Sequence, residues 1–278
     1  MAWSKLKNII ILMLLGVNLM LAGLALFYWQ REAVSQKTAM ENAVAILEKQ
    51  GVSLETKLEE MSLPVMAVQR DQAREDVLAA ALLGEADKED RGAGVYRYTS
   101  DRGMIQFHSN GEFSAAFPAG AFLLEGQAPE EHALDMLELL DFQGQVLSVR
   151  EKEGITTVVV RQQFNGTPLL SCQAVLEYEG GCLIAIAQGR RLNGTPYPDM
   201  EAERPISAAS ALIRFVNGVR ELGDVSKTIT QVEESYLLSS TLTGPARMTP
   251  VWYITTDTGS YQLNGLTGDL TLSSEMNS

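Results

Sequence analysis

The sequence predicts an α+β protein, with an N-terminal transmembrane helix followed by an extracytoplasmic region of helices packed on antiparallel sheets. The first 30 residues contain one long apolar run without charge. Later segments alternate between helical spacing of apolar residues and strand-like alternation, and Asn-Gly or Gly-Gly pairs separate several of the strands. Helices segregated to one face of antiparallel sheets make an α+β fold.

The composition is that of a folded, acidic protein. Of the 278 residues, 46% are hydrophobic and 21% are charged, and the formal net charge is -13. The length allows one large or two modest domains after the anchor. An acidic surface repels phosphate backbones and anionic lipid headgroups, so we expect no nucleic-acid binding and no peripheral attachment to a membrane.

The predicted anchor is the charge-free run from Asn8 to Trp29. Its apolar part has about 21 residues, or roughly 31 Å of helix, which matches the hydrocarbon thickness of a bilayer. A cleaved signal peptide is the competing interpretation. Ala22-Gly23 is the only small-residue pair near a suitable cleavage position, and the apolar run continues beyond it, so the anchor is favoured.

The residues that flank the run predict its orientation. Trp3 precedes it and Tyr28-Trp29 close it, as expected of aromatic residues at the two membrane interfaces. Lys5 and Lys7 are the only charged side chains before Arg31. The positive-inside rule therefore places the N-terminus in the cytoplasm and everything after the helix outside the cell membrane.

Periodicity predicts the elements that follow the anchor. Apolar residues recur at helical spacing in 31–60, 71–83, 129–140 and 207–218, with Ser207 as a candidate N-cap. Residues 85–94 and 118–127 are predicted loops. Strands are predicted at 63–68, 95–98, 104–107, 113–117, 145–150, 156–164, 168–178, 182–188, 229–238, 251–255 and 261–263.

The chain is divided accordingly into four parts. We expect a cytoplasmic tail (1–7), a transmembrane anchor (8–30), an N-terminal α+β lobe (31–125) and a C-terminal α+β lobe (126–278). Asn165-Gly166-Thr167 and Asn193-Gly194-Thr195 both fit the glycosylation pattern. Hairpin turns explain the two Asn-Gly pairs better than sugar attachment does.

The sequence is poor in catalytic and metal-binding residues. It has two histidines: His108 at a predicted strand end and His132 at an exposed helix start, neither with a second ligand at suitable spacing. Adjacent carboxylates such as Glu130-Glu131 are typical of solvated faces. If Gly180-Gly181 is a turn, Cys172 and Cys182 lie too far apart for a disulfide and are expected to be small buried hydrophobes. We therefore predict no enzyme activity, no metal and no cofactor.

Both ends of the chain resemble a known family. The start, Met1-Ala2-Trp3-Ser4-Lys5-Leu6-Lys7, runs directly into the apolar helix and is similar to the start of YycI proteins, regulators of the YycF/YycG (WalR/WalK) two-component system of Gram-positive bacteria. The end resembles the closing unit of YycI and YycH proteins and of PepSY domains. It comprises Pro205–Ala211, Pro250–Ile254, Gly259–Asn264 and Leu266–Leu270. Residues 60–200 match no motif of the family.

The resemblance implies a non-enzymatic regulator of cell-wall homeostasis. Its partners would be a sensor histidine kinase similar to YycG/WalK and a YycH-like protein, and contact would run largely through the transmembrane helix. Within that helix Asn18 is polar and suited to bonding a partner helix, and Gly16 and Gly23 lie seven residues apart, where they permit close packing. The family offers no catalytic residues to transfer.

Two other functions remain open from the sequence. A PepSY-type inhibitor or ligand-binding module would act outside the membrane on a cell-envelope enzyme or peptide, through the soluble part alone. A cell-envelope hydrolase would require a pocket with convergent carboxylates of shifted pKa. The sequence gives neither the sign of regulation nor the ligand sensed.

Overall fold

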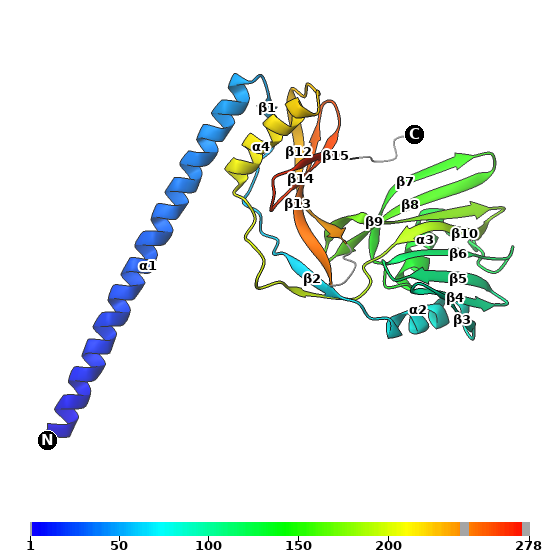
Figure 1. Cartoon of the computed structure of the whole chain (residues 1–278), viewed down its shortest axis with the longest axis horizontal. Helices are drawn as coiled ribbons and strands as arrows, with labels where there is room; N and C mark the ends of the chain where they lie inside the picture. Colours follow the sequence, from blue (N-terminus) through cyan, green and yellow to red (C-terminus); the bar gives the residue numbers. More distant parts are fainter. Residues whose placement is uncertain (1, 240–244, 274–278) are drawn as a thin grey trace.

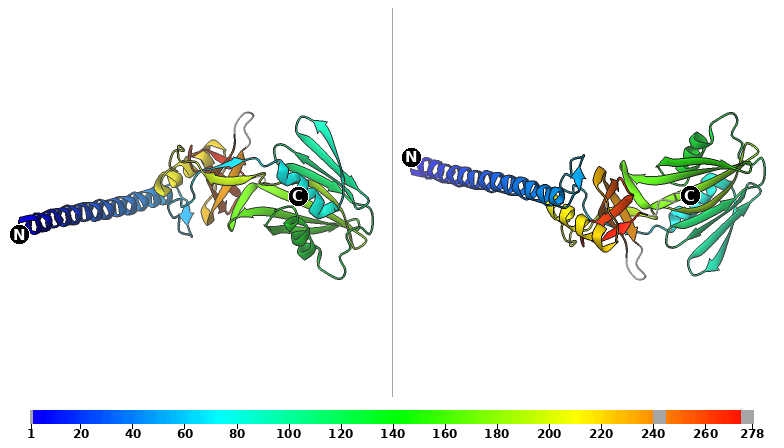
Figure 2. Two further views of the ribbon diagram at one scale, coloured as in Figure 1. Left: turned by 90° about the horizontal axis from the view of Figure 1, so that it is seen from below. Right: turned by 90° about the horizontal axis from the view of Figure 1, so that it is seen from above.

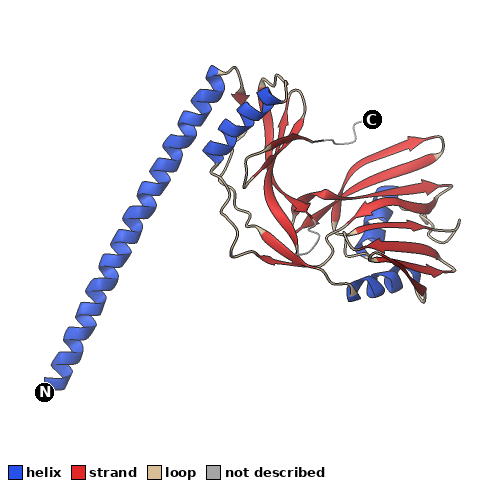
Figure 3. Ribbon diagram, viewed as in Figure 1, coloured by secondary structure: helices blue, strands red, loops and turns tan. Residues whose placement is uncertain are grey.

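The computed structural model describes residues 2–239 and 245–273, except for the side chains of residues 2–6, 8–11, 25–26, 28–30 and 32–33. One long helix, α1 (Ala2–Lys49), projects away from a body that consists mainly of strands (Figures 1 and 3). The two further views show the same projection (Figure 2). Among the described residues, no helix has the length and apolarity that crossing a membrane requires. Residues 8–11, 25–26 and 28–30 of the predicted anchor lie outside the described side chains.

The body contains three further helices among the described residues: α2 (Ala73–Leu83), α3 (Pro129–Glu138) and α4 (Ala208–Glu221). The strands of its first part are β1 (Ser53–Leu54), β2 (Met66–Gln69), β3 (Asp87–Gly92), β4 (Val95–Ser100), β5 (Gly103–His108) and β6 (Glu112–Ala116). Those that follow are β7 (Gly144–Lys152), β8 (Ile155–Phe164), β9 (Thr167–Glu179), β10 (Cys182–Arg190), β11 (Thr195–Pro198), β12 (Thr228–Ser239), β13 (Ala246–Thr256), β14 (Ser260–Asn264) and β15 (Leu270–Leu272).

The strands form one continuous network that is joined through β9. Its main path is β11-β2-β13-β12-β9-β10-β6-β5-β4-β3, and β8 pairs with β9 while β7 pairs with β8. Most pairs are antiparallel, but β1 pairs with β12 in parallel, and Tyr236 of β12 pairs in parallel with Leu169 of β9. The long strand β9 therefore links a larger sheet, β3–β10, to a smaller sheet built around β12–β15.

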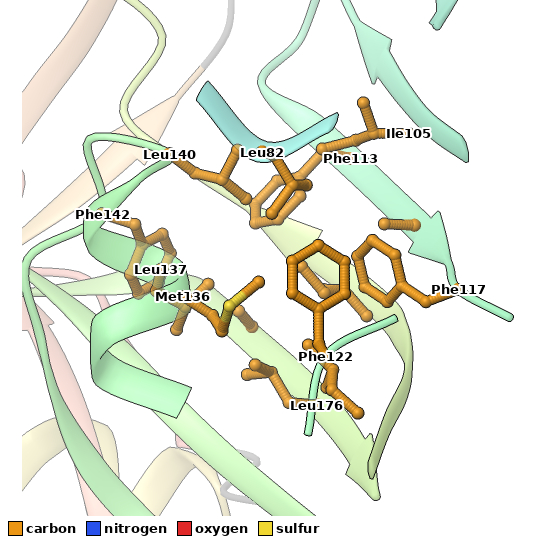
Figure 4. Close-up of a cluster of buried hydrophobic side chains, with 14 of the residues drawn as sticks. Leu82, Ile105, Phe113, Phe117, Phe122, Met136, Leu137, Leu140, Phe142 and Leu176 are labelled. Carbon is orange, nitrogen blue, oxygen red and sulfur yellow. The ribbon is translucent and has the colours of Figure 1, made fainter. Parts of the chain in front are cut away.

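The larger sheet carries α2 and α3 on one face. Leu82 of α2, Leu137 of α3 and Leu176 of β9 belong to one buried cluster, which is drawn in Figure 4. Phe117 and Phe122 stack edge to face in it with ring centroids 4.7 Å apart. The cluster holds residues from 78 to 186, so the predicted lobe boundary between residues 125 and 126 falls inside it.

The smaller sheet packs against α4 and the end of α1. Ala43 and Leu47 of α1 are buried with Leu212 and Phe215 of α4 and with Trp252 of β13. Ser207 caps α4, because its side chain accepts a hydrogen bond from the backbone N–H of Ser210. The sequence-based prediction of this cap is confirmed.

The first helix both begins and ends earlier in the chain than predicted, at Ala2 and Lys49. It runs without a break through the predicted anchor, but it ends at Lys49, so the prediction of helix to residue 60 is wrong. Gly51 adopts a left-handed φ of 81°, and the backbone N–H of Val52 bonds the carbonyl of Leu47 at 3.1 Å. This Schellman arrangement ends the helix.

Two loop or turn predictions are also wrong. Residues 87–92 form the edge strand β3, whose side chains are all exposed. Because most of its residues are charged, β3 shows no apolar alternation in the sequence. Charged edge strands are common because they prevent edge-to-edge aggregation. Asn193-Gly194 makes no hairpin, because β11 pairs with β2 and not with β10. Asn193 is instead buried and donates a hydrogen bond to Glu75 at 3.4 Å.

The predicted hairpins within the larger sheet are confirmed. Asn165-Gly166 has φ values of 51° and 80°, and Gly180-Gly181 has φ values of 58° and 78°. Positive φ at both central residues is typical of the tight turns that match the twist of paired strands. These two turns set the register of β8, β9 and β10.

Candidate functional site

The candidate site is a hollow on the face of the larger sheet opposite α2 and α3. Two adjoining cavities of about 520 Å³ each share Gln173, Ala187 and Gln188 as lining residues. We call the two cavities together the trough. One end reaches the tip of the β7–β8 hairpin, and the other end reaches the junction with the smaller sheet.

Strand alternation explains why these side chains point into the trough. Successive residues of a strand face opposite sides of a sheet. On β8, Val158 and Val160 are buried beneath the helices, so Val159 and Arg161 face the trough. The register continues the pattern across the sheet, with Val159 opposite Val175 and Arg161 opposite Gln173 on β9.

The trough carries more positive than negative charge, unlike the rest of the chain. Its lining contains four basic side chains other than histidine and two carboxylates, Glu112 and Glu177. The whole chain, in contrast, has 22 basic and 35 acidic residues. The basic residues are Arg150, Lys152, Arg161 and Arg190. An acidic protein that gathers cations in one hollow creates a local field that attracts anions.

The smaller sheet supplies the wall at the junction end. Gln262 of β14 and Ser273 line this end together with Arg161 and Arg190. The guanidinium carbon of Arg161 lies 5.8 Å from the ring centroid of Tyr253 on β13, within the range of a cation–π contact. His108, predicted at a strand end, also lines this end, and its Nε2 lies 2.9 Å from Nε2 of Gln106.

Two groups with shifted pKa values, His132 and Asp141, lie beside the helices on the opposite side of the larger sheet. His132 is buried, contrary to the prediction of an exposed position, and its Nδ1 lies 3.1 Å from the Tyr178 hydroxyl. Burial lowers the pKa of His132 and raises the pKa of the Cys172 thiol to about 12. A bidentate pair with Arg74 lowers the pKa of Asp141. Each shift therefore has a structural cause.

The described residues contain no group of three or more His, Cys, Asp or Glu side chains arranged to hold a metal ion. Cys172 and Cys182 are both free. Cys172 is fully buried as predicted, whereas Cys182 is partly exposed and its thiol donates weakly to the carbonyl of Gly180 at 3.8 Å.

The residues proposed from the sequence for partner contact lie far from the trough on α1. Gly16, Asn18 and Gly23 are all exposed, and a Cβ added at either glycine would meet no atom within 4 Å. Seven residues bring Gly16 and Gly23 to nearly the same side of the helix. Asn18, two residues beyond Gly16, is turned about 200° away from it. The helix thus presents the glycines and the asparagine on different sides.

The trough is not predicted by the sequence. Its basic residues are spread over 40 positions of the chain, from Arg150 to Arg190, and no motif joins them. A usable signal was present: Arg150 ends and Arg161 interrupts a predicted strand of an acidic chain, and Arg190 comes two residues after the predicted strand 182–188. Assigning the inward face of each strand would have placed Arg161 and Gln173 together on the outward face.

No family model and no curated protein matches the chain. Among solved structures, an uncharacterized protein from Eubacterium rectale ATCC 33656 aligns with a TM-score of 0.43 at 10% identity, over 80% of this chain and 85% of that one. The Bacillus megaterium YpeB C-terminal domain aligns with a TM-score of 0.37 at 10% identity, over 74% of this chain and 98% of that domain. Neither alignment is close enough to assign a shared fold or function.

Proposed function

We propose that the chain is a non-enzymatic regulatory protein, anchored in a cell membrane by the first part of α1, with the body outside the cytoplasm. The observation that carries the proposal is the apolar surface of α1. Leu12, Met13, Leu14 and Leu15 are consecutive, so together they span a full helical turn, and all four are between 55% and 72% exposed. A helix that is apolar on every side requires lipid or protein around it.

The two ends of α1 differ in burial, which supports an anchor at one end and a place in the body for the other. Leu19, Met20, Leu21 and Phe27 are also exposed, whereas Ala43 and Leu47 are completely buried in the body. One continuous helix therefore runs from an unpacked apolar segment into the core of the smaller sheet. Such a rigid connection suits a protein that transmits a change between a membrane partner and its body.

The proposed partners are a sensor histidine kinase similar to YycG/WalK and a YycH-like protein. Support for these partners comes from the resemblance of the two chain ends to YycI proteins. Asn18 on one side of α1 and the pair Gly16 and Gly23 on the other offer two different contact surfaces, one polar and one permitting close approach. Two partner helices have room to pack on one anchor in this arrangement.

An anchor exchange tests the proposal. Residues 8–29 are replaced by an unrelated membrane helix of equal length, and the full chain is purified from membranes with the kinase co-expressed. We expect the exchanged chain to remain in the membrane fraction and to lose the kinase. Asn18→Leu should weaken co-purification, whereas the matched control Met20→Leu should not. Retained kinase binding by the exchanged chain contradicts contact through the helix.

A second candidate function is a ligand-binding or inhibitory module of the PepSY type that acts through the body. The observation in its favour is the trough, a hollow lined by basic and amide side chains from both sheets. For this function the anchor is only a tether. The exchanged chain should then bind its target as well as the original chain does.

A further inference from the structure

We propose that the trough binds an extended peptide segment of a partner protein, in which two acidic residues are separated by three others and an apolar residue lies midway. This inference rests on the second candidate function, because it names the ligand class of a binding module. Three features of the trough support this ligand: the spacing of its cations, the chemistry of the floor between them, and its contrast in charge with the rest of the chain.

The cations lie at the two ends of the trough at a spacing that fits an extended chain. Arg150 of β7 is paired with Thr157 of β8, and Arg161 lies four residues farther along β8. Four residues of a strand span about 13 Å. A peptide lying extended along β8 and β9 covers the same length with four of its own residues, so carboxylates at positions i and i+4 would meet the two ends.

Lys152 and Arg190 reinforce the two ends. Lys152 adjoins Arg150 at the hairpin tip, where both side chains are exposed, and Arg190 lines the junction end with Arg161. In an extended peptide, residues i, i+2 and i+4 point to one side. Two carboxylates four positions apart can therefore both face the trough, whereas a spacing of three would turn one of them away.

The floor between the cations is apolar and bordered by amides. Val159 and Val175 lie directly opposite each other on β8 and β9, and Leu147 of β7, 40% exposed, lies beside them. Gln173 and Gln188 are placed to donate and accept hydrogen bonds. An apolar residue at position i+2 fits this floor, and the amides suit peptide groups.

The floor also decides between two classes of polyanion. A phosphate polymer carries charge at every repeat and has no apolar group to place on Val159 and Val175. A peptide with carboxylates at the ends and an apolar side chain between them satisfies both the cations and the floor. Charge complementarity should also steer such a peptide to the trough, since the remainder of the chain is strongly acidic.

The test uses the full chain in detergent micelles and three fluorescein-labelled nonapeptides, followed by fluorescence anisotropy. The probe is Ser-Thr-Glu-Thr-Val-Thr-Glu-Thr-Ser. One control peptide moves the second Glu one position toward the first, and another replaces both Glu by Lys. We expect the probe to bind, to bind more weakly as salt rises, and to bind at least about tenfold more tightly than either control.

Variants of the chain locate the binding site. Arg150→Gln combined with Arg161→Gln should weaken probe binding by about tenfold, since the two changes remove one charge-assisted contact at an exposed position and one at a partly exposed position. Val159→Thr, which keeps the side-chain shape, should weaken it by a smaller factor. Arg220→Gln, at an exposed basic residue of α4 outside the trough, is the matched control and should have no effect.

Because Arg161 also contacts Tyr253, a second pair of variants guards against misfolding. Arg150→Gln with Lys152→Gln changes only exposed side chains at the hairpin tip and should also weaken binding of the probe. Equal binding of the probe and both control peptides, or binding unchanged in these variants, overturns the inference. Displacement of the probe by inorganic polyphosphate, with no difference between Val159→Thr and the original chain, overturns it in favour of a general anion site.

The anchor exchange separates this inference from the regulatory proposal. The exchanged chain should bind the probe as tightly as the original chain, whatever happens to kinase co-purification. Loss of the kinase with probe binding intact supports both proposals. Retained kinase with probe binding intact contradicts only contact through α1, and absent probe binding in the original chain contradicts only the peptide site.

Discussion

The two faces of the larger sheet are built from the same strands but have opposite chemistry. On β9, Ala174 and Leu176 point toward the helices and are completely buried, whereas Val175 and Gln173 line the trough. One face holds apolar side chains packed among aromatic rings, and the other holds cations and amides around a short apolar floor. Stability and binding are therefore assigned to alternate residues of single strands, and substitutions at neighbouring positions should separate them.

The largest expected difference is in thiol reactivity, between Cys172 in the buried cluster at the junction of the two sheets and Cys182 at the start of β10. Burial raises the pKa of Cys172 to about 12, and its side chain is inaccessible, whereas Cys182 lies opposite Glu179 and is partly exposed. A pKa that high leaves a thiolate population about a thousandfold below that of an ordinary thiol at neutral pH. We expect iodoacetamide to label Cys182 in the native chain and Cys172 only after denaturation, as read by mass spectrometry.

The variant Cys182→Ser provides the control for thiol labelling. It should leave the native chain almost unlabelled and give one labelled thiol in denaturant. Rapid native labelling of Cys172 would mean that the cluster it shares with Leu169, Tyr236 and Met248 opens readily, and the contrast between the two thiols would then fail.

The second difference is in stability, and it is tested by two neighbouring residues. Leu176→Ala removes three carbons from the buried cluster and should lower the free energy of unfolding by about 3 kcal/mol, because the surrounding rings cannot close the cavity. Val175→Ala shortens a half-buried side chain in the trough and should cost less than about 1 kcal/mol. Urea unfolding of the full chain in detergent measures both.

Peptide binding should respond in the opposite order. Val175→Ala changes the floor of the trough and should lower the affinity for the acidic peptide. Leu176→Ala should leave the affinity of the folded fraction unchanged. Equal loss of stability in the two variants would show that the trough face is also part of the core.

The elements that alternation and spacing define were predictable from the sequence. The strands near 156–164, 168–178 and 182–188 were predicted within a few residues, because one face of each is apolar and tight turns separate them. The strand β3 was not, because all its residues are exposed, and β11 was not, because two of its four residues are proline. Their pairing depends on tertiary neighbours.

The trough lay beyond prediction for a related reason. Each of its cations looks like an ordinary solvated residue in the sequence, and only the register of β7, β8, β9 and β10 brings them to one face. The apolar run at residues 8–29 that predicts an anchor, in contrast, is visible from composition alone. Local signals reveal features carried by one segment, whereas a site assembled from four strands requires the register as well.

The smallest expected effect concerns His132, which ties α3 to the helix-covered face. Its ring packs edge to face on Tyr178, with centroids 5.6 Å apart, and burial lowers its pKa, partly offset by Asp135. In the unfolded chain this imidazole takes up a proton below about pH 6.5, whereas in the folded chain it stays neutral to a lower pH. Stability is therefore fully present above pH 6.5 and is lost as the pH falls toward the folded-state pKa.

His132→Gln should abolish this part of the pH dependence, because glutamine does not titrate. Urea unfolding at pH 7.5 and at pH 5.0 measures it, and the change should be smaller than the loss caused by Leu176→Ala. Tyr178→Phe removes the hydroxyl partner but keeps the buried imidazole, so its pH dependence should persist. An unchanged slope in His132→Gln would assign the acid sensitivity to other groups, and the helix-covered face would then contain no proton-linked contact at His132.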